Sequence, residues 1–435
     1  MVRIWAIVIA ISQLGFCHWV AAYQLEQVRL IVQNDDRKPP FDRDRYLLVP
    51  RGFRIAVVAR VYQARFILPV THTDTLVALP FANKIVLVRE SPEGKTQILD
   101  FLTHLKKPQG MALWRSPGQT FLYAAASNEV VRMPFDPGSD RPGPLETIVP
   151  NLPDASDPEL HGAYAHDLKN IVIGPDNKLY VDIASASNAN PADTTSDPIR
   201  CAIYVYDLIG GSGRFFARGI RNAEGLGFVP GTTELWAVVN ERDDIRFPFH
   251  RGFMAGSKDD FGRRITAYVD DHPPDELIRV REGADYGWPF ANPDPDTPNG
   301  MNNMPFDPDV DANPDWSKCP EKLFTRVNKG IQAHSAPLGM TFLQETKLPS
   351  SFRNGLAVAL HGSSDRSIKT GYKVIFFPWL DSGEPGDPSD LVSGWLDDAT
   401  QEEWGRPVDV RPAADGRSLL ISDDFSGTLY RLSPG

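Results

Sequence analysis

A short strand-turn-strand unit recurs along this chain, and it restricts the possible folds more than any other feature of the sequence. In the clearest copy, an apolar run at 171–173 is followed by a Gly-Pro-Asp-Asn turn at 174–177 and a second apolar run at 179–181. Proline presets φ for a turn and asparagine tolerates positive φ, so this pattern predicts two antiparallel strands joined by a tight turn. Copies of the unit occupy 110–125, 171–181, 225–239, 339–360 and 408–421.

Third apolar runs complete several of these units. They lie at 202–206, 276–280, 372–377 and 428–432. With the leading segment 53–89 the chain has six units, spaced about 45 to 70 residues apart, and no helical periodicity competes with them. This pattern predicts an all-β fold, a six-bladed β-propeller whose blades have about four antiparallel strands. We expect the two ends of the chain to share the closing strand, because this hides the sheet edges.

The sequence predicts a single folded domain preceded by two short segments. Residues 1–22 combine a charged start, an apolar run and a small-residue end, which is typical of a secretory signal peptide. Residues 23–50 are charged, and we expect an irregular N-terminal lead-in there. Residues 51–435 are predicted to form the propeller. No apolar run approaches the roughly 20 residues of a membrane helix, so we expect a secreted, extracellular protein without a membrane span.

The chain is acidic, with a formal net charge of −11. This argues against nucleic acid or an anionic membrane as a partner. Of the three cysteines, Cys17 falls in the predicted signal peptide, which leaves Cys201 and Cys319 as a candidate disulfide pair. The sequence leaves this pairing open, because it depends on the separation of the two Cα atoms.

Four basic residues occupy equivalent places in the repeat. His166, Arg221, His334 and Arg406 each lie shortly before the first strand of a unit. Neighbouring strands of a blade alternate in direction, so the starts of all first strands lie on one face and these side chains should meet in one pocket. Several cations and a histidine in an acidic protein suggest a ligand with several carboxylates. The alternative is that the arginines bind backbone carbonyls within loops.

Several blocks of the sequence carry a resemblance to a known family. They are 167–181, 217–226, 273–280, 283–289, 333–339, 359–363 and 405–410. In this order they resemble the pyrroloquinoline quinone (PQQ)-dependent sugar dehydrogenases, and within them the sorbosone dehydrogenase and fungal pyranose dehydrogenase branch, Auxiliary Activity family 12. The resemblance also implies a six-bladed propeller, and it implies PQQ and Ca²⁺ as cofactors.

The resemblance assigns roles to residues that match the family's motifs. His166 would be the catalytic general base, and Arg221 would polarise the quinone and stabilise the charge that develops on it. Asn222 would hold the cofactor, and the backbone carbonyls of Glu241 and Arg242 would bind calcium, which prefers oxygen ligands.

Five further residues are candidates for the remaining cofactor and substrate contacts. Arg406 matches a family arginine that pairs with a cofactor carboxylate, and His334 would contact the cofactor or the substrate. Arg366 is the nearest candidate for another cofactor cation, with Lys369 as its rival. Gln109 is the candidate for a glutamine of the bacterial pocket, and a turn residue is the equal alternative.

One departure bears on the substrate. Ala165 stands where the bacterial glucose enzymes carry an acidic residue before the histidine, which argues against a glucose-like binding mode. The Pro-rich acidic segments 292–299 and 307–313 could bind a second calcium ion, although such dense proline is more typical of a solvated loop.

The leading hypothesis is therefore a secreted, calcium-requiring PQQ-dependent sugar dehydrogenase. The family implies oxidation at C1 of aldoses or keto-aldoses, such as L-fucose or 2-keto-glucose, with electrons passed to an external acceptor such as a separate cytochrome-bearing redox protein. The alternatives are a calcium-dependent propeller lactonase or other hydrolase, and a non-catalytic propeller that binds a partner or a carbohydrate.

Overall fold

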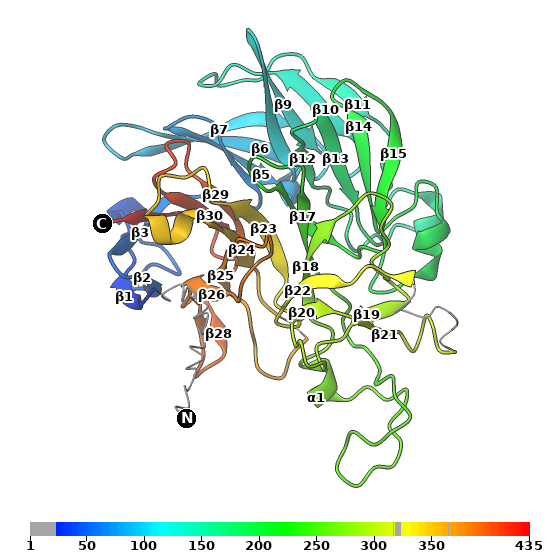
Figure 1. Cartoon of the computed structure of the whole chain (residues 1–435). Helices are drawn as coiled ribbons and strands as arrows, with labels where there is room; N and C mark the ends of the chain where they lie inside the picture. Colours follow the sequence, from blue (N-terminus) through cyan, green and yellow to red (C-terminus); the bar gives the residue numbers. More distant parts are fainter. Residues whose placement is uncertain (1–22, 316, 318–322, 364) are drawn as a thin grey trace, which may run out of the picture.

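Six antiparallel sheets follow one another along the chain and are arranged around a common axis (Figure 1). The computed structural model describes residues 23–315, 317, 323–363 and 365–435. The first strands of successive sheets contact each other in the order β4, β8, β12, β16, β23, β29 and back to β4, so they surround the axis. This is the predicted all-β, six-bladed propeller.

Each blade has four principal strands. The first blade contains β4 (Ile67–Pro69), β5 (Asp74–Leu79), β6 (Lys84–Glu90) and β7 (Thr96–Thr103). The second contains β8 (Met111–Ser116), β9 (Gln119–Ala125), β10 (Val130–Pro134) and β11 (Glu146–Val149). The third contains β12 (Ile171–Ile173), β13 (Lys178–Ile183), β14 (Ala202–Asp207) and β15 (Gly210–Arg218).

The remaining three blades follow the same plan. The fourth contains β16 (Ala223–Phe228), β17 (Leu235–Val239), β18 (Asp275–Val280) and β22 (Val327–Ile331), with β20 (Asn302–Met304) added at its edge. The fifth contains β23 (Pro337–Phe342), β24 (Gly355–Leu360), β25 (Lys373–Pro378) and β26 (Ser389–Val392). The sixth contains β29 (Pro407–Pro412), β30 (Leu419–Asp423), β31 (Thr428–Pro434) and β3 (Phe53–Arg60).

The two ends of the chain close the ring. Strand β3 pairs antiparallel with β31, from Phe53 opposite Pro434 to Arg60 opposite Thr428. The expected sharing of the closing strand is confirmed. The sequence grouping was wrong in one respect, since it placed 53–59 with the first unit, whereas this strand belongs to the last blade. The first blade begins instead with the three-residue strand β4, which is too short to stand out as an apolar run.

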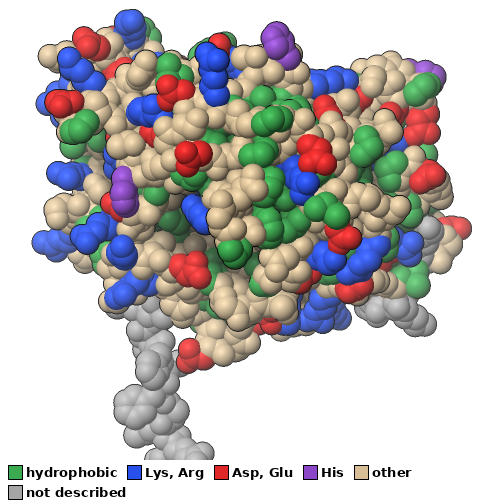
Figure 2. Space-filling model, turned by 90° about the horizontal axis from the view of Figure 1, so that it is seen from above, with side chains coloured by type: hydrophobic (Ala, Val, Ile, Leu, Met, Phe, Trp, Pro, Cys, Tyr) green, Lys and Arg blue, Asp and Glu red, His purple; other side chains and the backbone are tan. Residues whose placement is uncertain are grey.

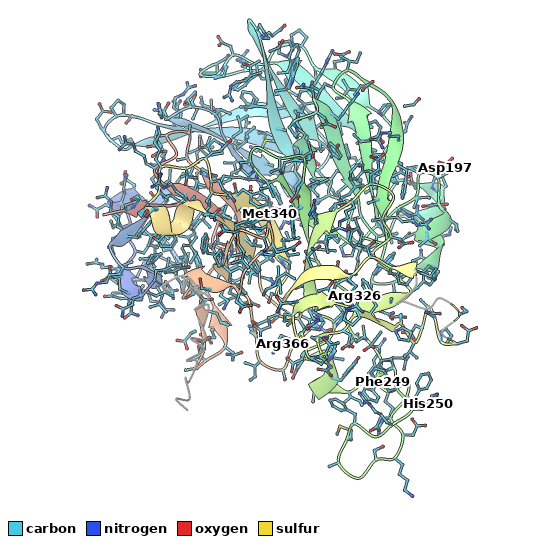
Figure 3. The ribbon with its side chains drawn as sticks, viewed as in Figure 1. Asp197, Phe249, His250, Arg326, Met340 and Arg366 are labelled. Carbon is cyan, nitrogen blue, oxygen red and sulfur yellow. The ribbon has the colours of Figure 1, made fainter. Side chains whose placement is uncertain are left out.

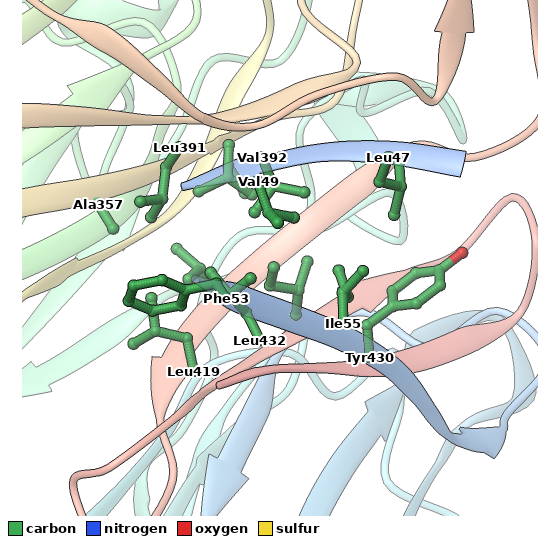
Figure 4. Packing of buried hydrophobic residues seen from close by; sticks show 14 of the residues in the cluster. Leu47, Val49, Phe53, Ile55, Ala357, Leu391, Val392, Leu419, Tyr430 and Leu432 are labelled. Atoms are coloured by element: carbon green, nitrogen blue, oxygen red, sulfur yellow. The ribbon is translucent and has the colours of Figure 1, made fainter. Parts of the chain in front are cut away.

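The lead-in is more regular than its charged composition suggests. Strands β1 (Leu25–Arg29) and β2 (Tyr46–Pro50) form an antiparallel pair, so the expectation of an irregular segment was wrong for these residues. Leu47 and Val49 of β2 pack in one hydrophobic cluster with Phe53 of β3 and Leu391 of β26 (Figure 4). Alternate residues of β2 are buried, and these apolar contacts hold the segment against the last two blades.

Apolar packing between neighbouring blades forms the core. All six residues of β24 and all five of β17 are buried, because both faces of these strands are covered. Trp236 of one blade packs edge-to-face on Trp379 of the next, with ring centroids 4.9 Å apart. A Cβ atom on Gly225 would lie 2.5 Å from the carbonyl oxygen of Leu338, so only glycine allows β16 and β23 to approach this closely.

Long connections project from one end of the propeller. The connection between β17 and β18 forms the loop that hangs below the blades in Figure 1 and has its own apolar cluster around Phe247 and Tyr268. The smaller elements of the connections are η1 (Asn34–Asp36), η2 (Pro80–Ala82), η3 (Pro158–Leu160), η4 (Pro191–Thr195), α1 (Thr266–Val269), β19 (Ala291–Pro293), β21 (Phe306–Pro308), α3 (Ser350–Arg353), β27 (Leu396–Asp397) and β28 (Glu402–Glu403).

The remaining sequence expectations concern the surface and the termini. On the face shown in Figure 2, acidic and basic side chains are interspersed. Within the described residues, no helix has the length and apolar character needed to cross a membrane. The predicted signal peptide at 1–22 and Cys319 lie outside these residues, and Cys201 is a buried free thiol.

Candidate active site

A cavity of about 220 Å³ lies where loops from several blades meet. Among the predicted residues, it is lined by His166, Arg221, Asn222, Glu241, His334 and Arg406. The positions before β12, β16, β23 and β29 therefore converge as the strand directions predict. Of the described residues, thirteen line the cavity, and most of them are polar or charged.

His166, which precedes β12, presents one ring nitrogen to the connection that follows β13. Its Nδ1 lies 3.1 Å from the carbonyl oxygen and 2.7 Å from the hydroxyl of Ser185. Because a carbonyl can only accept, Nδ1 carries the proton and Nε2 keeps its lone pair, without a hydrogen bond to any described residue. Burial and the charge of Arg221 lower the pKa of His166 to about 3, so the imidazole is neutral at physiological pH.

Arg221 is buried and held by groups from two connections. Its Nε and Nη2 donate to the backbone and side-chain oxygens of Asn188 at 3.2 and 3.0 Å, and Nη1 donates to the carbonyl of Asn240 at 3.1 Å. Asp243 lies 3.5 Å from the same guanidinium. The carbonyl of Arg221 accepts a hydrogen bond from Ser185 N, which links this arginine to the loop that orients His166.

Arg406 also uses backbone carbonyls while lining the cavity. Its Nε and Nη2 donate to the carbonyls of His361 and Gly362 at 2.9 and 2.8 Å. The guanidinium lies over the ring of Tyr372, 5.3 Å from its centroid. Nη1 makes no hydrogen bond to the described part of the chain. Both arginines therefore bind loop carbonyls, which was the alternative to cofactor binding. These bonds hold the guanidinium groups in place, and Nη1 of Arg406 can still donate to a ligand.

The carboxyl groups of Glu241, Asp243 and Asp275 form an acidic wall of the cavity. Glu241 Oε2 is buried without a hydrogen-bond partner in the described structure, and burial raises the pKa of Glu241 to about 8. Asp275 accepts hydrogen bonds from the backbone nitrogens of Glu241 and Ala336 at 2.9 and 3.0 Å, and burial raises its pKa to about 6. The cavity thus combines cations with acidic groups, rather than being uniformly basic.

His334 contacts both ends of the β17–β18 connection. Its Nε2 donates to the carbonyls of Val269 and His272 at 2.7 and 3.2 Å. Its Nδ1 faces Asp243 at 3.5 Å. Burial opposes a charge on this imidazole, but Asp243 and Asp275 outweigh it, so the pKa of His334 is raised.

The cavity also offers oxygen ligands for a cation. The backbone carbonyls of Glu241, which lines the cavity, and of Arg242, which does not, accept no hydrogen bond within the described chain. Ligand atoms of Asp243, His334 and Asp365 lie within 4.8 Å of one another at its edge. The carboxylates of Asp243 and Asp365 and the carbonyl of Glu241 are oxygen donors that suit calcium, whereas the imidazole nitrogen of His334 does not.

Four of the predicted or weighed side chains do not reach the cavity. The guanidinium of Arg366 donates to the carbonyl of Asp270, beside a separate depression near α1 (Figure 3). Lys369 pairs with Glu403 at 2.6 Å. The remaining two are the Arg242 side chain, which pairs with Asp309 and Asp311, and Gln109, which bonds Arg65 and Glu224.

Sequence reasoning did not assign three titratable lining residues to the pocket: Asp243, Asp275 and His361. Asp243 and His361 follow the second strands of their blades, and Asp275 begins a third strand. Since β17 runs antiparallel to β16, a residue that leaves β17 lies on the same face as one that enters β16. Residues that follow a second strand could therefore have been predicted to line the pocket, as were the residues that precede a first strand.

Comparisons with known proteins agree with this architecture. A family model described as TrAA12-like matches residues 94–434. An uncharacterized protein of Borreliella burgdorferi is 26% identical over 260 residues, which cover 59% of this chain and 57% of that protein. A pyrroloquinoline quinone-dependent pyranose dehydrogenase of Coprinopsis cinerea is 30% identical over 149 residues, 27% of this chain and 20% of that protein. The chain thus matches less than two thirds of either relative's length.

Solved structures share the fold over nearly the whole chain. The holo PQQ domain of pyranose dehydrogenase from Coprinopsis cinerea superposes with a TM-score of 0.71 at 20% identity, covering 89% of this chain and 97% of that one. The calcium structure of a Trichoderma reesei family AA12 protein gives 0.68 at 19% identity, with coverage of 89% and 97%. At this identity the likeness establishes the propeller fold.

Proposed function

Since this chain belongs to the AA12 family of PQQ-dependent sugar dehydrogenases, we propose that it oxidises C1 of aldoses or keto-aldoses at the cavity around His166. The observation that supports this best is the meeting of two arginines with a neutral imidazole in one polar cavity. PQQ carries three carboxylates and, when bound, supplies the acceptor for a hydride. A cavity with two guanidinium groups and amide donors fits such a polyanion.

His166 is the proposed general base. Its free Nε2 would take the proton of the sugar's anomeric hydroxyl, and the bond from Nδ1 to Ser185 would keep the ring in the required tautomer and orientation. A polyanion beside Arg221 would offset the positive charge that helps to lower the pKa of His166. We therefore expect this pKa to rise toward neutrality when the cofactor binds.

Arg221, Asn222 and Arg406 are the proposed cofactor ligands. The free Nη1 of Arg406 would bind a carboxylate, and Arg221, which is fixed by Asn188, would stabilise negative charge that develops during the reaction. The carbonyls of Glu241 and Arg242 would hold calcium. Arg366 and Lys369 are not in this set, because neither side chain lines the cavity.

The substrate and cellular setting remain proposals on sequence grounds. Ala165 in place of an acidic residue favours L-fucose-type or 2-keto-glucose-type sugars over glucose. The pattern of residues 1–22 supports secretion, and an external acceptor, such as a cytochrome-bearing redox protein, would then receive the electrons.

The acidic wall favours one second candidate, a calcium-dependent lactonase. Glu241, Asp243 and Asp275 line the cavity together with the amides of Asn222 and Asn240. Side-chain carboxylates and amides around calcium could activate a water for ring opening. The two arginines are better matched to an anionic cofactor, so the dehydrogenase is preferred.

Reconstitution tests the proposal. Purified protein is mixed with PQQ and calcium, and reduction of a dye acceptor is followed on adding L-fucose or an osone. We expect turnover with the wild type and a loss of about 10²-fold or more in His166→Ala. His250→Ala is the matched control, because the His250 side chain is 72% exposed on a distant loop. Lactone opening without PQQ would favour the hydrolase, and PQQ binding without sugar oxidation would contradict both enzymes.

A further inference from the structure

A second group of potential metal ligands lies outside the cavity. His272 precedes β18, whereas Asp294 and Asp296 follow β19 in the next long connection. One ligand atom from each of the three side chains lies within 4.8 Å of the others. The His272 Nε2 atom is 3.5 Å from Asp296 Oδ2. The connections before β18 and after β19 therefore meet at this point.

His272 has the features of an imidazole prepared to bind a metal. It is only 6% exposed, and its ring stacks on Tyr268 with centroids 4.1 Å apart. Its Nδ1 donates to the carbonyl of Tyr268 at 3.1 Å, so the lone pair is on Nε2. That buried Nε2 has no hydrogen-bond partner among the described residues. Metal-binding histidines commonly donate their second ring nitrogen to a carbonyl in this way.

The surrounding charge is negative. Asp307 of β21 pairs with Asn292 of β19, so a third carboxyl group lies beside the connection that carries Asp294 and Asp296. Thr297 adds a buried hydroxyl oxygen that has no partner in the described structure. A bound cation would neutralise this excess.

We propose that His272, Asp294 and Asp296 bind one divalent transition-metal ion of the zinc type. In a tetrahedral site, ligand atoms about 2.1 Å from the ion are about 3.4 Å apart, which matches the separation of His272 Nε2 from Asp296 Oδ2. Imidazole nitrogen suits zinc and similar ions, whereas calcium takes oxygen ligands. The Asp296 side chain is 66% exposed, which leaves room for water in the remaining position.

This ion would stabilise a segment that supports the cavity. The carbonyl of His272 accepts a hydrogen bond from His334 Nε2, and Asp275 begins the strand that follows. Fixing His272 to the connection after β19 would therefore hold the backbone that positions His334. The site would have this structural effect without contacting sugar or cofactor, and it does not depend on the proposed dehydrogenase activity.

Metal titration tests the site. Tag-free full-length protein is stripped with a chelator and dialysed, and Zn²⁺ binding is measured by calorimetry, with Co²⁺ absorption as a report on coordination. We expect one tight equivalent of Zn²⁺, not displaced by equal Ca²⁺, and binding weakened about tenfold or more in His272→Gln and Asp296→Asn. His250→Gln, which alters the exposed His250–Asp259 pair, should bind as the wild type does.

The second cluster in the chain supplies the decisive comparison. Asp243, His334 and Asp365 could also attract zinc, so Asp365→Asn should retain the tight equivalent and its Co²⁺ spectrum. Equal Zn²⁺ affinity in wild type and Asp296→Asn, or loss of the equivalent in Asp365→Asn alone, would overturn the proposal. If His272→Gln does not fold, Asp296→Asn decides the question, because its side chain is mostly exposed.

Discussion

At the scale of single residues, the cavity is notable for opposite charges that are buried close together. Arg221 is 3% exposed and Glu241 is 5% exposed, and both line the same space. The charge of Arg221 favours ionisation of Glu241, but burial outweighs it and keeps the carboxyl protonated near neutrality. Calcium binding in the cavity should therefore release the proton of Glu241, because a bound calcium ion would favour the ionised carboxylate.

This proton gives a pH dependence that can be measured. The pKa of Glu241 is raised from 4.5 to about 8, so between these values the folded protein holds a proton that the unfolded chain has lost. Stability from this group is fully present below about pH 4.5 and is lost as pH rises through about 8. The unfolding free energy of the wild-type apo-protein should therefore fall between pH 5 and 8. In Glu241→Gln this fall should be smaller by at least about 1 kcal/mol. Urea unfolding at both pH values measures this, and an unchanged pH slope would contradict it.

Arg406 provides a prediction about cofactor retention. A hydrogen bond to a charged group contributes about 1.5–3 kcal/mol, so Arg406→Ala should weaken PQQ binding about 10- to 100-fold. Turnover at saturating PQQ should fall much less, because the free Nη1 is assigned to binding. Fluorescence titration gives the affinity, and Lys369→Ala is the control, since that lysine pairs with Glu403 away from the cavity. Equal losses of PQQ affinity in Arg406→Ala and Lys369→Ala would contradict the assignment of Arg406 as a cofactor ligand.

At the scale of elements, short strands hold the site in place and the connections supply its chemistry. The sequence predicted most strands of the blades, because their apolar runs are bounded by Pro, Gly and Asp turns. It also predicted that residues before β12, β16, β23 and β29 meet. It did not predict where Arg366 and Lys369 point, because these side chains bind Asp270 and Glu403, which come from connections remote in sequence. Such contacts depend on loop conformations that no periodicity encodes.

The closing strand β3 carries a prediction of its own. Ile55 is fully buried opposite Leu432 of β31, whereas the neighbouring Arg54 points to solvent. Ile55→Ala should lower the unfolding free energy by about 2–5 kcal/mol, and Arg54→Ala should change it by less than about 0.5 kcal/mol. Denaturant unfolding compares the two, and equal effects would mean that β3 does not close the ring.

At the scale of the whole molecule, the ring depends on sheet edges being covered. Strand β3 protects the outer edge of the sixth blade, and the β1–β2 pair covers the apolar cluster beside it (Figure 4). The lead-in was misjudged from sequence because its charged residues dominate the composition, although alternate residues of β2 are buried. The continuous apolar run at 46–50 was the signal that could have revealed this strand.

Two deletions separate these roles. Removing 23–50 should leave a soluble propeller with a lowered melting temperature, since the β3–β31 pairing persists. Removing 23–60 should give mainly aggregated protein, because β31 becomes an exposed edge. Size-exclusion chromatography and thermal melting distinguish the outcomes. A soluble monomer from the longer deletion would show that closure is dispensable.

The pairing of β3 with β31 also has a consequence for biosynthesis. Residues 53–60 are synthesised long before residues 428–434, because five blades lie between them in the sequence. This apolar strand is therefore unpaired while those five blades are made. During that interval it is a natural target for a chaperone, and any translocation machinery would handle the polypeptide in an open form. The ring closes only when β31 has been synthesised and pairs with β3.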